Sequence, residues 1–363
     1  MTRIFGQHDE QTIAQIQDVA SRAQKAALMA DGHVGYVMPI GGVAAYRDQV
    51  SVVGVGFDIA CGNAAIRTNL QLSDFGATHE QVHQTLAQLA DDIQQEISFG
   101  IGRKNRADDA PLDHPLFESP VWAAVPATHR ADLLKKAREQ LGTVGSGNHY
   151  VDVFVDENGA IWVGVHFGSR GFGHTIASAF LAIGQGEKWG TRVKEKEVLL
   201  PLQEATGHDY WQLMNLAGEY AYAGREWVAR KVVRMLGGTE EELVHNHHNF
   251  AWREQHEGEE LIVVRKGATP AFPGQLGFVG GSMGDDAVII RGRDVEAARS
   301  ALYSTVHGAG RVMGRREAKR RVNWRASRAR LREQQIELRG GGADESPECY
   351  KSLADVLAYH GRT

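Results

Sequence analysis

Residues 54–63 read Gly-Val-Gly-Phe-Asp-Ile-Ala-Cys-Gly-Asn and hold a carboxylate and a thiol separated by two residues. Asp58 offers a hard oxygen ligand and Cys61 a soft thiolate, and glycine permits the sharp turn that points both at one ion. This donor pair suits Mn, Zn or Fe better than Mg or Ca. The structural alternative is a small buried cysteine beside an aspartate that caps a turn. The β-branched residues at 52–55 predict a strand that leads into this segment.

A second group of candidate ligands lies in a predicted β-hairpin, whose turn is residues 156–159. If the whole turn forms a four-residue loop, His149 lies opposite His166. If only residues 158–159 form the loop, the two histidines become diagonal neighbours. Both registers put the two imidazoles on one face, because side chains alternate with a period of two. The two histidines can take one ion each or share one. The predicted strands are residues 150–155 and 161–167.

Two more histidine segments follow towards the C-terminus. Three of the four residues 245–248 are histidines, which makes this the densest histidine cluster in the chain and a candidate source of ligands. His307 precedes a small-residue loop at 308–310. His33, in contrast, is predicted to be a hydrogen-bonded turn histidine.

Several loops have the composition of anion-binding turns. Residues 168–173 combine four small residues with Arg170 in front of an apolar helix, which is how a phosphate-binding turn is built. Residues 265–270, with Lys266, and the glycine-rich residues 280–284 are of the same kind. None of them has the spacing of a P-loop, so a Walker-type nucleotide site is not supported.

Helical periodicity predicts the elements that carry these loops. The clearest helix begins with a capping box formed by Thr78 and Gln81. The aromatic stripe of the longest helix is interpreted as core. The predicted helices are residues 9–29, 78–98, 131–141, 175 onward and 209–236.

Composition limits the class of protein. The 363 residues are 42% hydrophobic and 23% charged, which is typical of a globular protein, whereas 42 glycines exceed the usual share and imply many tight turns. Two cysteines form no disulfide framework and fit a reducing compartment, so we expect a cytoplasmic protein. No apolar run is long enough for a membrane span, and no signal peptide is evident, so no membrane partner is expected.

Charge is distributed unevenly along the chain. The formal net charge of -5 argues against non-specific nucleic-acid binding, yet residues 311–332 contain ten basic residues and a single acid. That segment is a candidate contact for a polyanion. If it is helical, four of its arginines fall along one side, which we call the arginine face: Arg321, Arg325, Arg328 and Arg332.

Taken in order, these motifs resemble the RtcB-type RNA-splicing ligase family. The resemblance runs from Asp-Gly-His-Val-Gly at residues 31–35 to Glu-Cys-Tyr-Lys at 348–351. Between them lie Gly-Phe-Asp-Ile-Ala-Cys-Gly, Gly-Ser-Gly-Asn-His-Tyr, His-Phe-Gly-Ser-Arg-Gly, His-His-Asn-Phe, Arg-Lys-Gly-Ala-Thr-Pro, Gly-Gly-Ser-Met-Gly and His-Gly-Ala-Gly-Arg.

The resemblance implies an α+β fold: one large domain over residues 1–363, with mixed sheets, surrounding helices and a central cleft for two metal ions. The family joins an RNA 3′-phosphate or 2′,3′-cyclic phosphate to a 5′-hydroxyl, using GTP and two Mn²⁺ ions. RNA ends of these kinds are the implied partners, with an archease-type activator as a further one. RNA repair or tRNA splicing is the implied role.

Carried over to this sequence, the resemblance implies a role for each matching residue. Cys61 would bridge the two ions, with Asp58 and His149 on one ion and His166 and His248 on the other. His307 would be the nucleophile that takes GMP. The guanylate-binding residues would be Asn148, Asp152, Asn249, Gly281, Ser282, Met283, Gly308, Ala309 and Gly310. The phosphate-holding or RNA-contacting residues would be Arg170, Lys266 and Arg311.

The sequence departs from the family pattern at several positions. Tyr36 stands where many members carry Lys, and Asp152, one methylene shorter, stands where many carry Glu. The other departures are Gly224 for Asn, Ala287 for Ser and Gly314 for Ser. The family chain normally continues past Cys-Tyr-Lys through a final strand, whereas residues 359–363 end this one. We therefore expect a cut chain or an incomplete nucleotide pocket.

Two other functions compete with ligation. A metal-dependent phosphoesterase that opens 2′,3′-cyclic phosphates would use the same metal ligands but would not need His307. An inactive protein that binds RNA ends or nucleotides would show binding without turnover.

Overall fold

The computed structural model describes residues 2–361. Its larger sheet has five strands in the order β1-β2-β3-β11-β10, and all its pairs are antiparallel except β1 with β2. The strands of this sheet are β1 (Arg3–Ile4), β2 (Lys25–His33), β3 (Ile40–Tyr46), β10 (Asn249–His256) and β11 (Glu259–Lys266).

A second, antiparallel sheet has four strands in the order β6-β7-β5-β9. Its strands are β5 (Gly62–Gln71), β6 (Tyr150–Val155), β7 (Ala160–Phe167) and β9 (Glu240–His247). Three short strand pairs complete the β-structure: β4 (Gln49–Ser51) with β8 (Leu199–Pro201), β12 (Ala268–Pro270) with β15 (Ser304–Val306), and β13 (Leu276–Val279) with β14 (Val288–Arg291).

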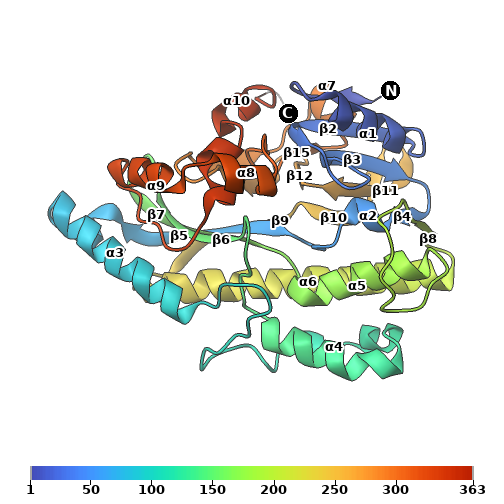
Figure 1. Cartoon of the computed structure of the whole chain (residues 1–363), viewed down its shortest axis with the longest axis horizontal. Coiled ribbons are helices and arrows are strands. Elements are labelled where there is room, and N and C mark those ends of the chain that lie inside the picture. Colours follow the sequence, from blue (N-terminus) through green and yellow to red (C-terminus); the bar gives the residue numbers. More distant parts are fainter. Residues whose placement is uncertain (1, 362–363) are drawn as a thin grey trace.

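One long helix, α6 (Ala205–Met235), packs against both sheets. Its N-terminal half contributes Tyr210 and Leu213 to a core with strands of the larger sheet, and its C-terminal half contributes Val228 and Val232 to a core with β5 and β7. Figure 1 shows α4 (Ala127–Gln140) beneath α5 (Arg170–Ile183) and α6, and the strands above them. This shared helix is what holds the two sheets side by side.

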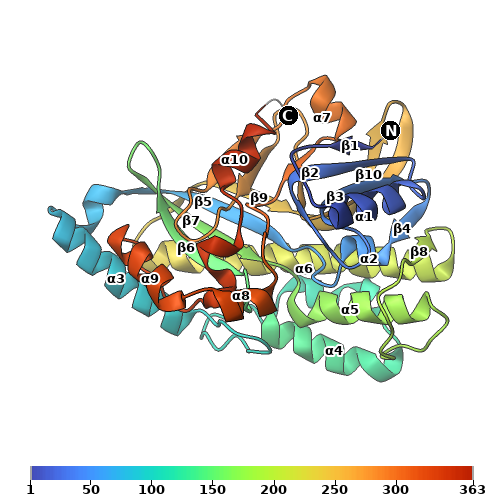
Figure 2. The same ribbon diagram turned by 45° about the horizontal axis from the view of Figure 1, so that its top comes forward.

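The remaining helices lie around the sheets. In Figures 1 and 2 α9 lies near α3 at one end of the molecule, α8 lies closer to the middle, and α1 lies against the larger sheet at the other end. They are α1 (Glu10–Ala20), α2 (Val52–Val55), α3 (His79–Glu96), α7 (Glu296–Ser300), α8 (Arg315–Arg321), α9 (Trp324–Glu333) and α10 (Leu353–Ala358). Within residues 2–361, no helix is long and apolar enough to cross a membrane.

The mixture of helices and largely antiparallel sheets confirms the α+β class. The capping box is also confirmed, since Thr78 and Gln81 cap the start of α3 reciprocally. The extent 1–363 of a single domain stays a prediction, as does the loss of a final strand. Residues 362 and 363 of that prediction lie outside the described part of the chain.

Two local predictions are wrong. Residues 52–55 form α2, not a strand, because the Ser51 hydroxyl accepts a hydrogen bond from the Gly54 amide at 2.8 Å and caps one helical turn. The helix predicted over residues 9–29 ends at Ala20, and β2 begins at Lys25, because alanines there pair with β3 instead of continuing the helix. The helical condition set for the arginine face is met, but by two helices that are separated at residues 322 and 323.

Both predicted hairpin registers are wrong as well. Val155 pairs with Ile161, the second residue of β7, so Tyr150, and not His149, lies opposite His166. His149 nevertheless comes close to His166, with ring centroids 5.5 Å apart. It does so because it precedes the strand, where the backbone at Gly147 has a φ of 79° and does not follow strand alternation.

Candidate metal centre and adjoining histidine

The predicted metal ligands converge at one end of the four-stranded sheet. Gly62, the first residue of β5, pairs with Phe167 on one side and His247 on the other, which brings the neighbouring Cys61, His166 and His248 together. A side chain at Gly62 would press into the Asn246 carbonyl oxygen, 2.1 Å from a built Cβ, so this close approach of strands requires glycine.

Distances between donor atoms support a shared site. Sγ of Cys61 lies 3.2 Å from Nε2 of His166 and 3.6 Å from Nε2 of His149. Nε2 of His149 lies 3.0 Å from Oδ2 of Asp58. The rings of His166 and His248 are 5.0 Å apart, edge to face.

These atoms form two overlapping groups, each able to hold a cation. One group is Asp58, Cys61 and His149, and the other is Cys61, His166 and His248. Cys61 is common to both, which is the arrangement that a bridging thiolate requires. Nδ1 of His248 is buried without a hydrogen-bond partner among the described residues, as expected of a nitrogen reserved for a ligand. The residues present therefore fit a pair of metal ions.

The protonation states of the candidate ligands are compatible with binding of a metal ion. Burial, together with neighbouring histidines, holds the pKa of His166 and of His248 well below the usual value, so both imidazoles are neutral. Partial burial raises the pKa of Asp58, but the hydrogen bond from His149 and nearby positive charge outweigh it and lower the pKa to about 2. Burial and the Asp58 carboxylate raise the pKa of the Cys61 thiol well above its ordinary value, so a cation that binds there displaces a proton.

Contacts at Nδ1, the ring nitrogen that faces away from the metal centre, orient the ring of His149. Its Nδ1 lies 2.9 Å from the Val144 carbonyl oxygen and 3.1 Å from a guanidinium nitrogen of Arg170. Nε2 donates its hydrogen bond to Asp58 in this structure, and when a cation takes the place of that proton, donation from Nδ1 to the carbonyl leaves the Nε2 lone pair free for the cation. The Arg170 guanidinium passes directly under Gly145, where a Cβ would lie 1.7 Å from it. Glycine at position 145 is therefore what lets Arg170 reach the centre.

His307 lies beside this centre, and a buried carboxylate supports it. The rings of His307 and His248 are 4.9 Å apart. Oδ2 of Asp31, a fully buried side chain, lies 2.5 Å from Nδ1 of His307. The same oxygen accepts hydrogen bonds from the amides of His307 at 3.0 Å and Gly308 at 3.3 Å. Burial raises the pKa of Asp31, but His307 lowers it more, so this carboxyl is ionised.

Sequence reasoning missed Asp31. The nearby His33 is hydrogen-bonded as predicted, to the Asp31 carbonyl oxygen at 3.2 Å, but it is the last residue of β2 and does not lie in a turn. The only signal for Asp31 is a carboxylate inside an otherwise buried strand, β2.

Arg225 on α6 was also missed. Its guanidinium is fully buried and donates to the carbonyl oxygens of Ala60 at 2.8 Å and Phe167 at 2.6 Å, the residues next to Cys61 and His166. It also contacts His245 and His247, which belong to neither group of candidate ligands. Burial lowers the pKa of Arg225 to about 10, which leaves it charged at neutral pH. The sequence does contain a signal for a buried role of Arg225: it follows Ala221 by one helical turn and so falls on the apolar side of the helix.

Some of the predicted guanylate-binding residues lie around His307. Oδ1 of Asn249 accepts from the Gly267 amide at 2.7 Å, and Gly267 is close to the His307 ring. Gly308 faces the Gly280 carbonyl oxygen, which places the 280–284 loop, with Gly281, Ser282 and Met283, beside the 308–310 loop, with Ala309 and Gly310. Asp152 on β6 points to the same side of the sheet as Tyr150 and His166. Asn148 is exposed in the loop before β6.

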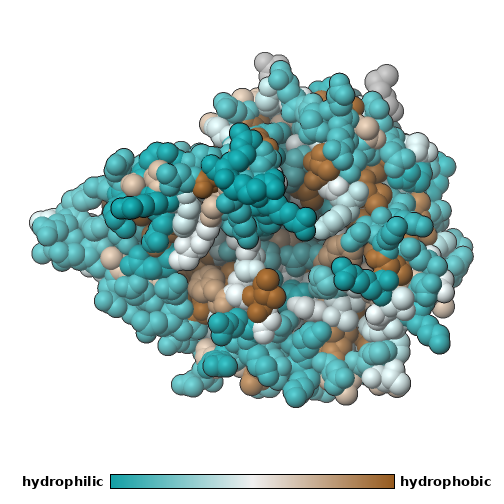
Figure 3. All heavy atoms as spheres, viewed as in Figure 1, coloured by the Kyte–Doolittle hydropathy of each residue, from teal (hydrophilic) through white to brown (hydrophobic). Residues whose placement is uncertain are grey.

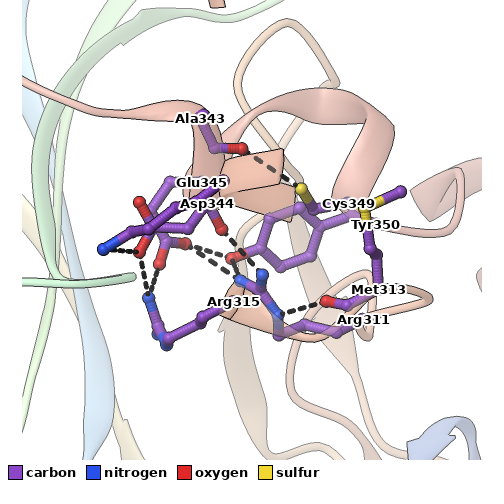
Figure 4. A network of polar contacts seen from close by, with 9 residues as sticks. Arg311, Met313, Arg315, Ala343, Asp344, Glu345, Cys349 and Tyr350 are labelled. Atoms are coloured by element: carbon purple, nitrogen blue, oxygen red, sulfur yellow. Dashed lines mark hydrogen bonds and ion pairs between the residues drawn. The ribbon is translucent and has the colours of Figure 1, made fainter. Parts of the chain in front are cut away.

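The three predicted phosphate-holding residues have different surroundings. Arg170 contacts His149, and the buried Lys266 ammonium donates to the Val53 carbonyl oxygen at 2.9 Å. Burial lowers the pKa of Lys266 to about 8. Arg311 instead joins a network near the C-terminus (Figure 4), donating to the Tyr350 hydroxyl at 2.8 Å and the Asp344 carbonyl oxygen at 2.7 Å. Its partners hold the chain after His307 in place, and its phosphate role stays a prediction.

Fold and site together define an α+β protein with a thiolate, imidazole and carboxylate centre beside a carboxylate-backed histidine. The family model described as tRNA-splicing ligase RtcB matches residues 12–362, and the chain belongs to that family. This confirms the resemblance noted in the sequence.

Named relatives agree. The chain is 32% identical to the tRNA-splicing ligase RtcB of Archaeoglobus fulgidus, over 91% of this chain and 82% of that protein. It is 32% identical to the RNA-splicing ligase RtcB of Escherichia coli K12, over 92% of this chain and 85% of that protein. It is 30% identical to the RNA-splicing ligase RtcB homolog 1 of Entamoeba dispar, over 91% of this chain and 74% of that protein.

Proposed function

We propose that this protein is a GTP- and Mn²⁺-dependent RNA ligase that joins 3′-phosphate or 2′,3′-cyclic phosphate ends to 5′-hydroxyl ends. It acts in RNA repair or tRNA splicing through a covalent GMP on His307. The family and the names of its relatives support RNA ligation. The observation that carries the mechanism is the Asp31–His307 pair beside the cluster that shares Cys61.

The position of Asp31 supports Nε2 of His307 as the attacking nitrogen. Asp31 lies against Nδ1, so a single ring proton held at Nδ1 would leave the Nε2 lone pair free to attack. This is the role that a carboxylate plays behind a catalytic histidine elsewhere, where it fixes the tautomer and stabilises the cation that forms.

The reaction then has three displacements after any cyclic phosphate has been opened by water. Nε2 of His307 attacks the α-phosphorus of GTP, a P–N bond forms, and the bond to pyrophosphate breaks. An oxygen of the RNA 3′-phosphate attacks the same phosphorus, breaks the P–N bond and returns the neutral ring. The RNA 5′-hydroxyl attacks the activated 3′-phosphorus, loses its proton and expels GMP.

The chain's own residues divide the work. Asp58, Cys61 and His149 would hold one Mn²⁺ ion, and Cys61, His166 and His248 the other. Such ions supply positive charge that offsets the charge on reacting phosphates. Asp31 orients the His307 ring. Arg170, in contact with His149, and Lys266, which precedes the Gly267 that lies close to His307, would add positive charge to the site.

RNA backbone contact is assigned to the arginine face. Its members are exposed, and Figure 3 shows strongly hydrophilic side chains over α8 and α9 beside a recess in this face of the molecule. The break between the helices leaves Arg321 on α8, where it pairs with Glu317 at 2.5 Å, and the other three members on α9. An archease-type activator is part of the proposal on the family resemblance alone.

The test is a GMP adduct. Purified protein incubated with GTP and MnCl₂ is expected to gain GMP by mass spectrometry, through an acid-labile, base-stable bond. His307→Ala should form no adduct yet should seal an RNA whose 3′ end already carries GMP in pyrophosphate linkage. His208→Ala, an exposed histidine on α6, is the matched control and should react like wild type. An adduct on His307→Ala that maps to His245, His247 or a lysine contradicts the mechanism.

The same assay separates the competing functions. Opening of a 2′,3′-cyclic phosphate by wild type without any GMP adduct or sealing would identify a phosphoesterase. Binding of RNA ends without turnover would identify an inactive binding protein.

A further inference from the structure

An exposed aromatic group adjoins the metal centre and is not used by the mechanism above. Tyr36, in the loop between β2 and β3, is 68% exposed although its ring belongs to a cluster. Its ring meets that of Phe57 edge to face at 6.0 Å, and Phe57 lies 5.7 Å from the exposed His174 on α5. We call Tyr36, Phe57 and His174 the aromatic shelf.

The shelf is continuous with the candidate active site on two sides. Phe57 immediately precedes Asp58, and the Lys266 ammonium lies 5.9 Å from the centroid of the Tyr36 ring. Gly267, next along the chain, is in contact distance of the His307 ring. His174 follows Arg170 by four residues on α5, so the two side chains lie on the same side of that helix. One positive charge, Lys266, thus adjoins the shelf, and another, Arg170, contacts the candidate ligand His149.

The Tyr36 loop is held in place. The side-chain amide of Gln15 donates to the Gly35 carbonyl oxygen at 2.8 Å, and its oxygen accepts from the Gly35 amide at 3.0 Å. It also donates to the Tyr36 carbonyl oxygen at 3.3 Å. A Cβ at Gly35 would lie 2.1 Å from the Met38 carbonyl oxygen, so the turn depends on glycine. The exposed ring is therefore presented by a fixed backbone and loses little entropy on binding.

We propose that the aromatic shelf stacks the base of the terminal nucleotide of the RNA strand that the site acts on. This rests on the proposed function and adds a subsite to it. Single-stranded ends are bound by aromatic stacking with nearby cations, and stacking tolerates any base because every base has a π-face. The Lys266 ammonium is attracted to the Tyr36 ring by a cation–π interaction, which helps to hold the ring in place. The surface of the ring that Lys266 does not cover stays free to stack on a base.

The experiment measures binding of short single-stranded RNAs, labelled at the far end, in MnCl₂ without GTP. One strand ends in a 3′-phosphate and the other in a 5′-hydroxyl, and each is made with a normal or an abasic terminal nucleotide. Tyr36→Ala should weaken binding of the normal strand with the relevant end by about 5- to 100-fold, the range of one lost base stack. The same variant should bind the abasic strand as wild type does, and Tyr36→Phe should retain affinity.

Tyr359→Ala, which removes a 51% exposed aromatic side chain directly after α10, is the matched control and should bind like wild type. The arm that responds tells whether the shelf takes the 3′-phosphate or the 5′-hydroxyl end. Equal losses for normal and abasic strands, or a Tyr36→Phe defect as large as that of Tyr36→Ala, would overturn the proposal. If wild type seals RNA but Tyr36→Ala binds the normal strands as wild type does, only the proposed role of the aromatic shelf is refuted. If Tyr36→Ala loses affinity for the normal strand alone but wild type does not seal RNA, only the ligase function is refuted.

Discussion

Asp31→Asn tests the support of His307 directly. The substitution keeps the size of a fully buried side chain and removes its charge. An asparagine oxygen can still accept from the amides of His307 and Gly308, bonds worth about 1 kcal/mol each, so we expect the fold to persist. What is lost is the negative charge 2.5 Å from Nδ1 of His307.

The magnitude follows from the charge that develops on the ring. As Nε2 bonds to phosphorus, the imidazole becomes cationic, and the carboxylate stabilises that cation. Opposite unit charges about 4 Å apart interact by about 4 kcal/mol at an effective dielectric constant of about 20. Loss of that interaction slows adduct formation by about 1,000-fold, and we expect a result between about 100- and 10,000-fold.

The assay is single-turnover transfer of radiolabelled GMP from GTP to the protein, with metal content determined by elemental analysis. Metal content and thermal unfolding should match wild type, and sealing of RNA already carrying the GMP cap should be nearly unchanged. A guanylylation rate within about threefold of wild type would refute the reasoning. Loss of metal together with the adduct would show instead that Asp31 maintains the metal centre.

Three further outcomes are expected. Cys61→Ala should lower the affinity of the protein for each ion by about 100-fold. Structural zinc sites with four ligands bind their ion with about 10–16 kcal/mol, so the loss of one ligand costs roughly 3 kcal/mol. Elemental analysis that finds two ions held at wild-type affinity would contradict a bridging role of Cys61. Binding of a 3′-phosphate strand should weaken by up to tenfold per pH unit above about pH 8, because the lowered pKa of Lys266 makes it lose its charge there, and Lys266→Arg should flatten this dependence in the same titration. Alanine at all four positions of the arginine face should flatten the log–log salt dependence of RNA affinity by about 0.7 to 1 per lost phosphate contact, for unrelated RNA sequences alike, whereas an unchanged slope would mean that the face is only solvated.

Local patterns were predictable where one interaction within a few residues decides the conformation. The reciprocal bonds of Thr78 and Gln81 start α3 as the sequence indicates, and the two runs around residues 156–159 do form a hairpin. The same local reasoning failed at residues 52–55, where valines predict a strand but a serine cap and burial favour one helical turn. It also failed on the hairpin register, which a one-residue change in loop length shifts.

The sequence alone determined which chemical groups are available and their order: a carboxylate and thiol at Asp58 and Cys61, then His149, His166, His248 and His307. Their spacing is enough to suggest a metal site and a family. Only the tertiary structure decided how they meet. Asp31 and His307 are 276 positions apart, and Arg225 reaches the carbonyls beside Cys61 and His166 from a different element. Contacts of this kind depend on how sheets and helices pack, and no local periodicity encodes which buried charge will face which ring.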